Sequence, residues 1–274
     1  MTLLSVSGLS KSFPVGQTML GRPQSQRLAV DDVSFEVGRA ETLALVGESG
    51  AGKSTAGRLV LRLIEPDAGS IHLDGVDVRA VHTRELRSFR RRMQIILQDP
   101  YTSFDPRLPI GHSIGEPLKV HFGMGRADRQ RKSLELLERV GMSAYHLGRF
   151  PRELSGGQLQ RAAVARALTV EPLLIVCDEP VAALDVSIRA QVLNLLQELQ
   201  EELGISYLFI SHDLALVEVF ADRVAVMQGG RIVETATPLQ LYRSPSHPYT
   251  QQLLDAIPKP VPRSLRVGDS LAVP

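Results

Sequence analysis

The alternation of apolar and polar residues predicts short strands separated by amphipathic helices. Val33, Phe35 and Val37 alternate with polar residues, which is typical of a strand buried on one face. Turn signals predict hairpins at residues 71–75 and 224–232. Mostly apolar runs indicate strands buried on both faces; they occupy residues 42–46, 92–97, 173–177 and 207–210. This order of elements favours an α/β fold.

The middle of the chain has a different pattern. Residues 188–203 form one long amphipathic helix pattern, but between about residues 99 and 168 the strand pattern nearly disappears and helical spacing replaces it. We therefore expect a helical insertion within a strand-rich core. Residues 238–274 hold seven of the 17 prolines, and the stretch from Pro258 is expected to be a loose tail. The expected division is a core (1–98 and 169–237), a helical part (99–168) and a C-terminal extension (238–274).

Composition narrows the class of protein. The 274 residues carry 31 basic and 30 acidic side chains, a net charge of +1, which argues against a protein that mainly coats nucleic acid. The longest wholly apolar run, residues 173–177, is far shorter than the roughly 20 residues of a membrane-spanning helix. No secretory signal pattern begins the chain, and the single cysteine, Cys177, excludes an internal disulfide. We expect a soluble cytoplasmic protein.

Residues 47–54 match the phosphate-binding pattern GxxxxGK[ST], directly after the strand predicted at residues 42–46 and before a helical stretch. Glycines let the backbone wrap closely, so that N–H groups and the helix N-terminus face phosphate oxygens. We expect Lys53 to reach the β- and γ-phosphates of a nucleoside triphosphate, and the Ser54 hydroxyl to bind Mg²⁺. The predicted nucleotide-binding residues are Gly47, Glu48, Ser49, Gly50, Ala51, Gly52, Lys53, Ser54 and Thr55.

Two acidic residues follow the apolar strand at residues 173–177. The carboxyl ends of parallel strands carry the ligand sites of α/β folds, so Asp178 and Glu179 are expected beside the phosphate loop. Asp178 can hold Mg²⁺ directly or through water, and Glu179 can polarise the water that attacks the γ-phosphate. Cys177 is expected to be a small apolar residue of the buried strand.

The pentapeptide at residues 154–158, Leu154-Ser155-Gly156-Gly157-Gln158, begins a predicted helix just before the acidic strand. A serine followed by two glycines at a helix start can form a second anion site. With the phosphate loop, this segment resembles the LSGGQ signature of the ATP-binding-cassette family, and the resemblance covers about residues 1–257. It implies an α/β P-loop NTPase (RecA-like) core with an N-terminal antiparallel β subdomain and an inserted helical subdomain. It also implies that two subunits pack head to tail, each signature closing over the other subunit's ATP.

Other elements of that family can be matched along the chain. Gln98 resembles the glutamine that contacts Mg²⁺ and the attacking water, and His212 resembles the switch histidine that contacts the γ-phosphate. Asp185 resembles the D-loop aspartate at the dimer interface. Phe13 resembles the aromatic residue that stacks on adenine, although a core position at a strand end suits it nearly as well.

Two positions depart from the family pattern. Ala182 replaces a common D-loop serine, which removes one hydrogen bond across the interface, and we expect hydrolysis to survive this change. Ala40 stands where a glycine is common before the first core strand, and we expect that change to be harmless.

Three segments resemble the ATPases of oligopeptide, dipeptide and nickel importers. They are residues 98–107, 178–196 and 244–258. His247, within the last segment, is expected in a turn between prolines. Many larger members have a cysteine-bearing tail that can hold an iron–sulfur cluster, and the single cysteine of this chain cannot build such a cluster. Shorter members occur among the nickel ATPases. The choice between peptide and nickel therefore stays open.

A basic cluster raises a nucleic-acid-linked cassette ATPase as the alternative from another class. Phe89 is the only aromatic residue interleaved with it, so a solvated helix face is the better interpretation. The cluster comprises Arg84, Arg87, Arg90, Arg91 and Arg92.

The resemblance implies the ATPase subunit of an importer, with ATP and Mg²⁺ as cofactors. Glu179, Gln98 and His212 would carry out hydrolysis, and Ser54, Gln98 and Asp178 would hold Mg²⁺. The implied partners are a second cassette (this chain again or a related one), two membrane permease subunits and, indirectly, an extracytoplasmic solute-binding protein, but no nucleic acid. The implied location is peripheral, at the cytoplasmic face of the inner membrane.

Overall fold

A six-stranded sheet forms the centre of the computed structural model, which describes residues 1–17 and 23–256. Its strand order is β10-β9-β3-β8-β7-β6, and all neighbouring pairs are parallel except β9 with β10. Hydrogen bonds join β3 to β8 and β8 to β7, so the ends of these three strands meet at one edge. The strands are β3 (Thr42–Val46), β6 (Met93–Ile96), β7 (Leu174–Asp178), β8 (Ser206–Ser211), β9 (Arg223–Gln228) and β10 (Arg231–Ala236).

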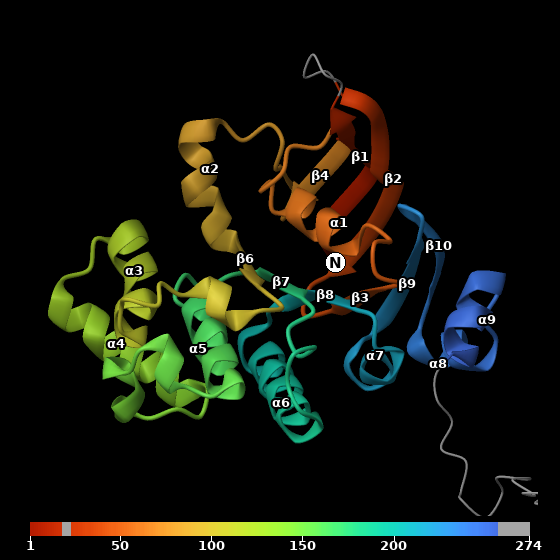
Figure 1. Ribbon diagram of the computed structural model, residues 1–274. Coiled ribbons are helices and arrows are strands. Elements are labelled where there is room, and N and C mark those ends of the chain that lie inside the picture. The colour runs from red at the N-terminus through yellow and green to blue at the C-terminus, as the bar shows by residue number, and fades with distance from the viewer. Residues whose placement is uncertain (18–22, 257–274) are drawn as a thin grey trace, which may run out of the picture.

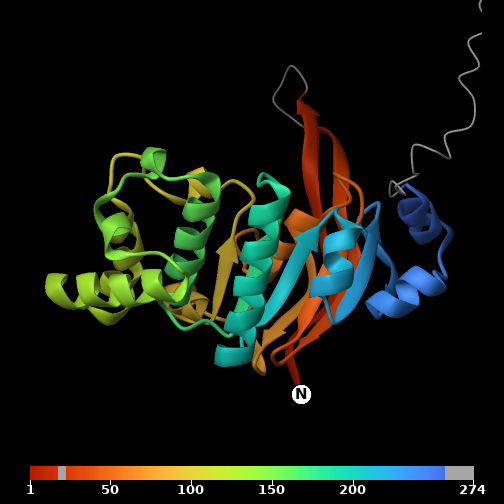
Figure 2. The same ribbon diagram turned by 90° about the horizontal axis from the view of Figure 1, so that it is seen from below.

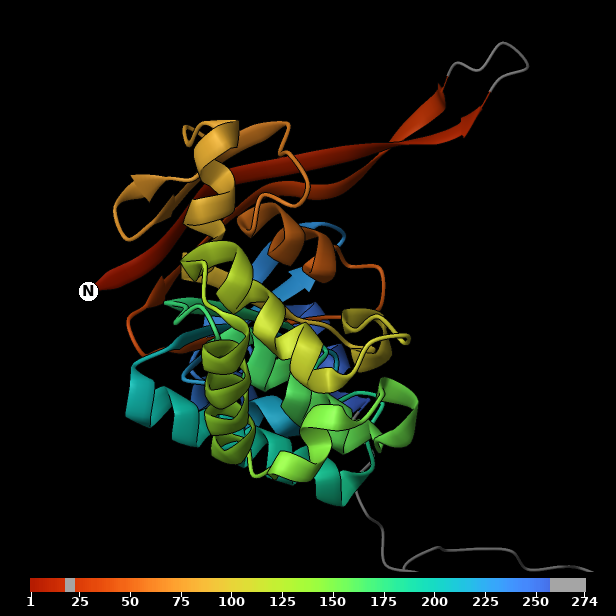
Figure 3. The same ribbon diagram turned by 90° about the vertical axis from the view of Figure 1, so that its left-hand side faces the viewer.

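A second, antiparallel sheet covers one side of the molecule, with the strand order β2-β1-β4-β5. Its strands are β1 (Thr2–Gln17), β2 (Pro23–Gly38), β4 (Ala68–Leu73) and β5 (Val76–Asp77). Strands β1 and β2 form a long ribbon that runs past the central sheet (Figure 3). Register shifts interrupt their pairing at four places, which explains why the sequence of β1 shows no regular alternation.

Helices cover the central sheet and form a separate group at one end. Helices α3, α4 and α5 lie together there, while α8 and α9 lie at the opposite end beside β9 and β10 (Figures 1 and 2). In the described part of the chain, no helix has the length and apolar character needed to cross a membrane. The helices are α1 (Lys53–Val60), α2 (Thr83–Phe89), α3 (Ile110–Phe122), α4 (Arg126–Arg139), α5 (Gly156–Leu168), α6 (Val186–Leu203), α7 (Leu214–Phe220), α8 (Pro238–Arg243) and α9 (Pro248–Asp255), with 3-10 turns at Arg90–Arg92, Pro100–Ser103, Ala144–Gly148 and Pro151–Glu153.

The central sheet separates two apolar clusters, because successive side chains of a strand point to opposite faces. On β3, Ala44 and Val46 join a cluster that includes residues of α3–α6, whereas Leu43 and Leu45 join a cluster with α1 and the antiparallel sheet. Cys177 lies fully buried on the face of β7 that meets the first cluster, as expected of a small apolar residue. Strand β3, which leads into the phosphate loop, is thus packed against an apolar cluster on each face.

The strands expected from the apolar pattern are confirmed, with small shifts at their ends. The helical stretch expected after the phosphate loop begins at Lys53 and ends at Val60, because Arg62 adopts a left-handed backbone with φ of 49°. The strand expected at residues 92–97 shortens to β6, because Arg90–Arg92 forms a 3-10 turn. Helices α3, α8 and α9 and strand β1 were not anticipated. The loose tail expected from Pro258 lies outside the described residues.

Two expectations were wrong in part. Ala40 adopts a left-handed conformation with φ of 51°, which is strained for a residue with a β-carbon, so the change from glycine is not harmless. The basic cluster is not entirely solvated: Arg90 donates a hydrogen bond to the Arg62 carbonyl, and the Arg91 guanidinium lies 4.4 Å from the centre of the Phe122 ring. Arg84, Arg87 and Arg92 are exposed, as expected.

Candidate functional site

The chemistry-bearing residues converge on a cavity of about 890 Å³ at the carboxyl edge of the central sheet. The phosphate loop follows β3, Glu179 follows β7, His212 follows β8 and Gln98 follows β6, so adjacent parallel strands bring together residues distant in sequence. Of the predicted residues, Ala51 and Asp178 are buried and do not line the cavity. Those that line it are Phe13, Gly47, Glu48, Ser49, Gly50, Gly52, Lys53, Ser54, Thr55, Gln98, Glu179 and His212.

Close packing explains two of the loop glycines. A β-carbon on Gly47 would lie 2.1 Å from the Met227 carbonyl oxygen, and one on Gly52 would lie 2.2 Å from the Ala29 carbonyl oxygen. Gly52 also has a φ of 103°, which a residue with a side chain rarely adopts. Only glycine therefore allows the loop to lie this close to the neighbouring backbone.

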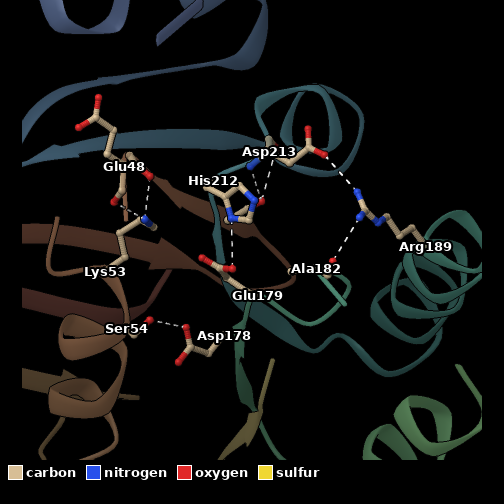
Figure 4. A network of polar contacts seen from close by, with 11 residues as sticks. Glu48, Lys53, Ser54, Asp178, Glu179, Ala182, Arg189, His212 and Asp213 are labelled. Atoms are coloured by element: carbon tan, nitrogen blue, oxygen red, sulfur yellow. Dashed lines mark hydrogen bonds and ion pairs between the residues drawn. The ribbon is translucent and has the colours of Figure 1, made fainter. Parts of the chain in front are cut away.

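Lys53 is the buried cation of the loop. Its ammonium donates to the carbonyls of Gly47 at 2.7 Å and Glu48 at 2.8 Å (Figure 4). Burial lowers the pKa of Lys53, and the nearby carboxylates of Glu179, Asp178 and Glu48 partly oppose that shift. A cation at the mouth of this glycine loop can receive the negative charge of a phosphate chain.

Ser54 and Asp178 meet between α1 and β7. The Ser54 hydroxyl donates to Asp178 Oδ1 at 2.6 Å (Figure 4). The Arg58 guanidinium lies 3.9 Å from Asp178 Oδ2. These oxygens, with the Gln98 amide, are donors of the kind that Mg²⁺ prefers. Among the described residues, no group of three or more His, Cys, Asp or Glu side chains is placed so that it could hold a metal ion. Mg²⁺ is commonly bound by one or two carboxylates together with the phosphates of a substrate. The donor set fits that mode of binding.

Glu179 and His212 form the polar pair at the cavity wall. His212 Nδ1 lies 3.1 Å from Glu179 Oε2, and the Glu179 carboxylate is 16% exposed compared with 57% for the His212 side chain (Figure 4). The Glu179 N–H donates to the Ile210 carbonyl at 3.0 Å, and its φ of 49° turns the chain sharply after β7. A half-buried carboxylate held by an imidazole can orient and polarise a water molecule.

Arg189, from α6, ties together the segments that follow β7 and β8. Its guanidinium donates to the Ala182 carbonyl at 3.2 Å and lies 3.6 Å from Asp213 Oδ2 (Figure 4). It also donates to the Leu184 carbonyl at 2.7 Å. Asp213 directly follows His212 in the chain. The arginine therefore connects the residues after Glu179 with the loop that carries His212, and sequence reasoning did not identify it.

The signature segment lies at a different hollow. Ser155 caps α5: its hydroxyl accepts from the Gln158 N–H at 3.3 Å, and the Gln158 side chain accepts from the Ser155 N–H at 3.0 Å. Ser155, Gly157 and Gln158 line a hollow of about 340 Å³, and no described residue lines both this hollow and the phosphate-loop cavity. Leu154 is buried, and Gly156 lies against Leu184. The signature segment and the phosphate loop therefore lie at two separate hollows of the chain.

Asp185 caps α6 rather than pointing into either hollow. Its carboxylate accepts from the Ile188 N–H at 3.0 Å and from the Ser187 hydroxyl at 2.9 Å. These hydrogen bonds hold the pKa of Asp185 below its usual range.

Sequence reasoning missed several residues that contact the cavity or its loop. Arg27 of β2 pairs opposite Phe13 and lines the cavity, but its exposed strand segment has no apolar pattern that could reveal it. Leu253 of α9 also lines the cavity, and the Tyr249 hydroxyl contacts the Glu48 N–H. The only signal for α9 was the resemblance of residues 244–258 to the importer ATPases. His247 caps this helix through its Nδ1, which accepts from the Tyr249 N–H at 3.2 Å.

Two family models match the chain. Residues 30–182 match the model described as ABC transporter, and residues 233–271 match the model described as oligopeptide/dipeptide transporter, C-terminal region. A Brucella ovis protein whose name describes a peptide import ATP-binding protein is 52% identical over 261 residues, which cover 95% of this chain and 80% of that protein. A glutathione import ATP-binding protein of Pectobacterium atrosepticum is 48% identical over 256 residues, 93% of this chain and 41% of that protein.

Solved structures resemble most of this chain in fold. A dimeric ATP-binding cassette in a post-hydrolysis state, bound to ADP and Pi, matches with a TM-score of 0.77 and 26% identity, over 86% of this chain and 99% of that chain. A subunit of an ABC transporter complex from Clostridium perfringens matches with a TM-score of 0.75 and 25% identity, over 89% of this chain and 91% of that chain.

Proposed function

The chain belongs to the ABC transporter family, and from this membership we propose that it is the ATP-binding and ATP-hydrolysing subunit of an importer for oligopeptides or dipeptides. The meeting of Lys53, Glu179 and His212 around one cavity is the observation that carries the ATPase part. The match of residues 233–271 to an oligopeptide/dipeptide transporter region supports the cargo, as do relatives named for peptide and glutathione import.

Nucleotide binding rests on the loop and the start of α1. A triphosphate carries about four negative charges, and the loop N–H groups and the helix N-terminus receive them. Lys53, now bonded to the Gly47 and Glu48 carbonyls, turns toward the β- and γ-phosphates. Phe13, at the cavity rim, stacks on adenine. In this proposal the other residues of the loop that the sequence analysis named also contact the nucleotide.

Ser54, Gln98 and Asp178 would hold Mg²⁺ together with the phosphates. Bound there, the ion would supply positive charge that neutralises the phosphates. Asp178 is buried and already fixed by Ser54, so this carboxylate needs little reorganisation when a ligand arrives.

Hydrolysis rests on Glu179, His212 and Gln98. Glu179 polarises a water molecule for attack on the γ-phosphate and takes its proton as the bond forms. His212 holds that carboxylate through Nδ1 and presents its exposed edge to the γ-phosphate. Gln98, which follows the neighbouring parallel strand β6, orients the same water. Positioning and electrostatics supply most of the rate enhancement in this arrangement.

The assembly we propose contains two cassettes, this chain twice or this chain with a related one. Each signature, Leu154 to Gln158, closes over the ATP of the other subunit, and Asp185 lies at their interface. Two permease subunits contact the helical part near residues 99–125, an extracytoplasmic solute-binding protein delivers cargo, and the complex places this chain at the cytoplasmic face of the inner membrane. In this proposal residues 1–98 and 169–237 are the nucleotide-binding core, 99–168 the helical subdomain and 238–274 the C-terminal extension.

Variants of the cavity test the ATPase assignment in the purified chain. Glu179→Gln should still bind ATP but lower the hydrolysis rate about 10²–10⁴-fold, because a general base is lost. Lys53→Ala should weaken ATP binding by at least about tenfold, because a charged hydrogen bond to phosphate is lost. Full turnover in Glu179→Gln, or unchanged ATP affinity in Lys53→Ala, would contradict the assigned roles.

Cargo is tested in vesicles that contain the complete transporter. ATP-dependent uptake of labelled di- and oligopeptides supports the proposal, whereas uptake of Ni²⁺ alone replaces it with the nickel alternative. Stimulation of ATP hydrolysis by DNA or RNA, with no uptake, supports the nucleic-acid-linked alternative instead.

A further inference from the structure

Helix α9 touches the phosphate loop through one side chain. The hydroxyl of Tyr249 accepts a hydrogen bond from the backbone N–H of Glu48 at 3.1 Å, across 201 positions of sequence. Tyr249 is 6% exposed, so this hydroxyl is held at a fixed place rather than in solvent. Glu48 is the second residue of the loop.

The bond acts on a peptide group that Lys53 also holds. The Gly47 carbonyl and the Glu48 N–H belong to one planar trans peptide group, and they point in opposite directions. The Lys53 ammonium donates to that carbonyl at 2.7 Å, while Tyr249 accepts from that N–H at 3.1 Å. The orientation of this peptide is therefore set from both sides.

The two restraints do not persist equally when a phosphate binds. Lys53 serves the phosphates in the proposed function, which draws its ammonium away from the Gly47 carbonyl. The Tyr249 hydroxyl has no such task, because it lies behind the loop and does not line the cavity. Tyr249 can thus hold the peptide at the entrance of the loop while the lysine moves.

Helix α9 is itself anchored to the hairpin that supports the loop. Glu234 of β10 accepts from the N–H groups of Ser246 at 2.8 Å and His247 at 3.0 Å, which fixes the turn before α9. From the same hairpin, the Gly230 N–H donates to the Ala51 carbonyl within the loop at 3.0 Å. The hairpin β9–β10 thus holds the loop directly and also holds the helix that carries Tyr249.

The same face of α9 reaches the cavity. Leu253 follows Tyr249 by four residues, which places both on one side of the helix. Leu253 lines the nucleotide cavity, whereas Tyr249 lies beneath its loop. Figure 1 shows α9 beside β9 and β10, at the end of the molecule opposite α3–α5.

We propose that α9 is part of the nucleotide site and that Tyr249 is a positioning residue, which orients the Gly47–Glu48 peptide and through it the phosphate-binding N–H groups of the loop. This inference rests on the proposed binding of ATP in this cavity. It gives the C-terminal region a role in nucleotide affinity, separate from any contact with cargo or permease.

The test removes one hydroxyl group from the full chain. Tyr249→Phe keeps the ring and its packing but removes the acceptor for the Glu48 N–H. The matched control is Tyr242→Phe, because the Tyr242 hydroxyl of α8 is also buried but has no hydrogen-bond partner among the described residues. Affinities for ATP and ADP are measured by calorimetry, and KM, kcat and the melting temperature are measured in parallel.

We expect Tyr249→Phe to raise the dissociation constants of ATP and ADP, and the KM for ATP, by about 2- to 10-fold. A change of this size corresponds to the loss of one hydrogen bond. The kcat and the melting temperature should stay close to those of the unaltered chain, and Tyr242→Phe should change none of these quantities. Unchanged affinity in Tyr249→Phe overturns the proposal, as does a lower melting temperature with unchanged affinity, which would assign the bond to stability alone. If the unaltered chain does not bind ATP, the proposed function fails instead.

Discussion

The Ser54 hydroxyl donates a hydrogen bond of 2.6 Å to the Asp178 carboxylate, although the two residues stand 124 positions apart. Ser54 lies in the first turn of α1 and Asp178 ends β7, so the bond joins the phosphate loop to the acidic strand. A ligand that needs oxygen donors from both elements finds them already side by side.

We expect Ser54→Ala to weaken ATP binding about tenfold in the presence of Mg²⁺, because the variant loses one oxygen ligand and the restraint on Asp178. With the metal removed by a chelator, the variant and the unaltered chain should bind ATP with similar affinity. The measurement is a calorimetric titration with and without Mg²⁺. An equal loss under both conditions would show that Ser54 acts on the loop and not through the metal.

Arg189 gives a second prediction. Arg189→Gln removes donors to the Ala182 and Leu184 carbonyls and the ion pair with Asp213, which loosens the segments beside Glu179 and His212. We expect kcat to fall about 3- to 10-fold with little change in KM, because two or three modest contacts position the groups for the reaction.

Arg62→Gln is the matched control for Arg189, because Arg62 likewise donates to two carbonyls, those of Val78 and Val81, away from the cavity. It should leave kcat unchanged. A rise in KM with unchanged kcat in Arg189→Gln would argue that this arginine affects nucleotide binding and not the reacting groups.

Ala40→Gly should stabilise the protein. Ala40 has a φ of 51°, and relief of its backbone strain outweighs the greater freedom of glycine in the unfolded chain, for a net gain of about 0.5–1 kcal/mol in the free energy of unfolding. Urea unfolding measures this quantity, and hydrolysis should be unaffected. A loss of stability would mean that the methyl group of Ala40 makes a packing contribution larger than the strain.

The capping carboxylate of Asp185 should make the stability of the protein depend on pH. Hydrogen bonds from the Ile188 N–H and the Ser187 hydroxyl lower the pKa of its carboxyl from 3.8. A lowered folded-state pKa gives stability that is present above pH 3.8 and is lost as the pH falls through the lowered value. Asp185→Asn keeps a capping side chain that does not titrate. The difference in urea midpoint between the unaltered chain and Asp185→Asn should therefore shrink as the pH falls below 3.8. A difference that does not change with pH would contradict the capping role of the charged carboxylate.

Local signals in the sequence predicted the parts of the site that lie next to one another in the chain. Neighbouring residues in the sequence indicate the role of the loop glycines and of the lysine that follows them. The same holds for the two acids at the end of an apolar strand. Adjacent parallel strands then bring Lys53, Glu179 and His212 to one edge, a consequence of the α/β pattern.

Contacts between distant segments could not be predicted in this way. Nothing within ten residues of Tyr249 indicates that its hydroxyl meets the Glu48 N–H, because that contact depends on how α9 packs against β9 and β10. Arg27 was missed since its position is set by pairing with Phe13 across an irregular ribbon. The left-handed backbone of Ala40 is equally invisible in composition, because a turn imposes it.

The single cysteine gives the unmodified chain its own reporter of motion. Cys177 is fully buried in β7, between β6 and β8 of the central sheet, and burial raises the pKa of its thiol. A thiol reagent can react there only when β7 opens, so the labelling rate counts openings of the strand that ends in Asp178. Ligands that bind at the end of this strand should slow the labelling, which makes the occupied state visible without any introduced probe.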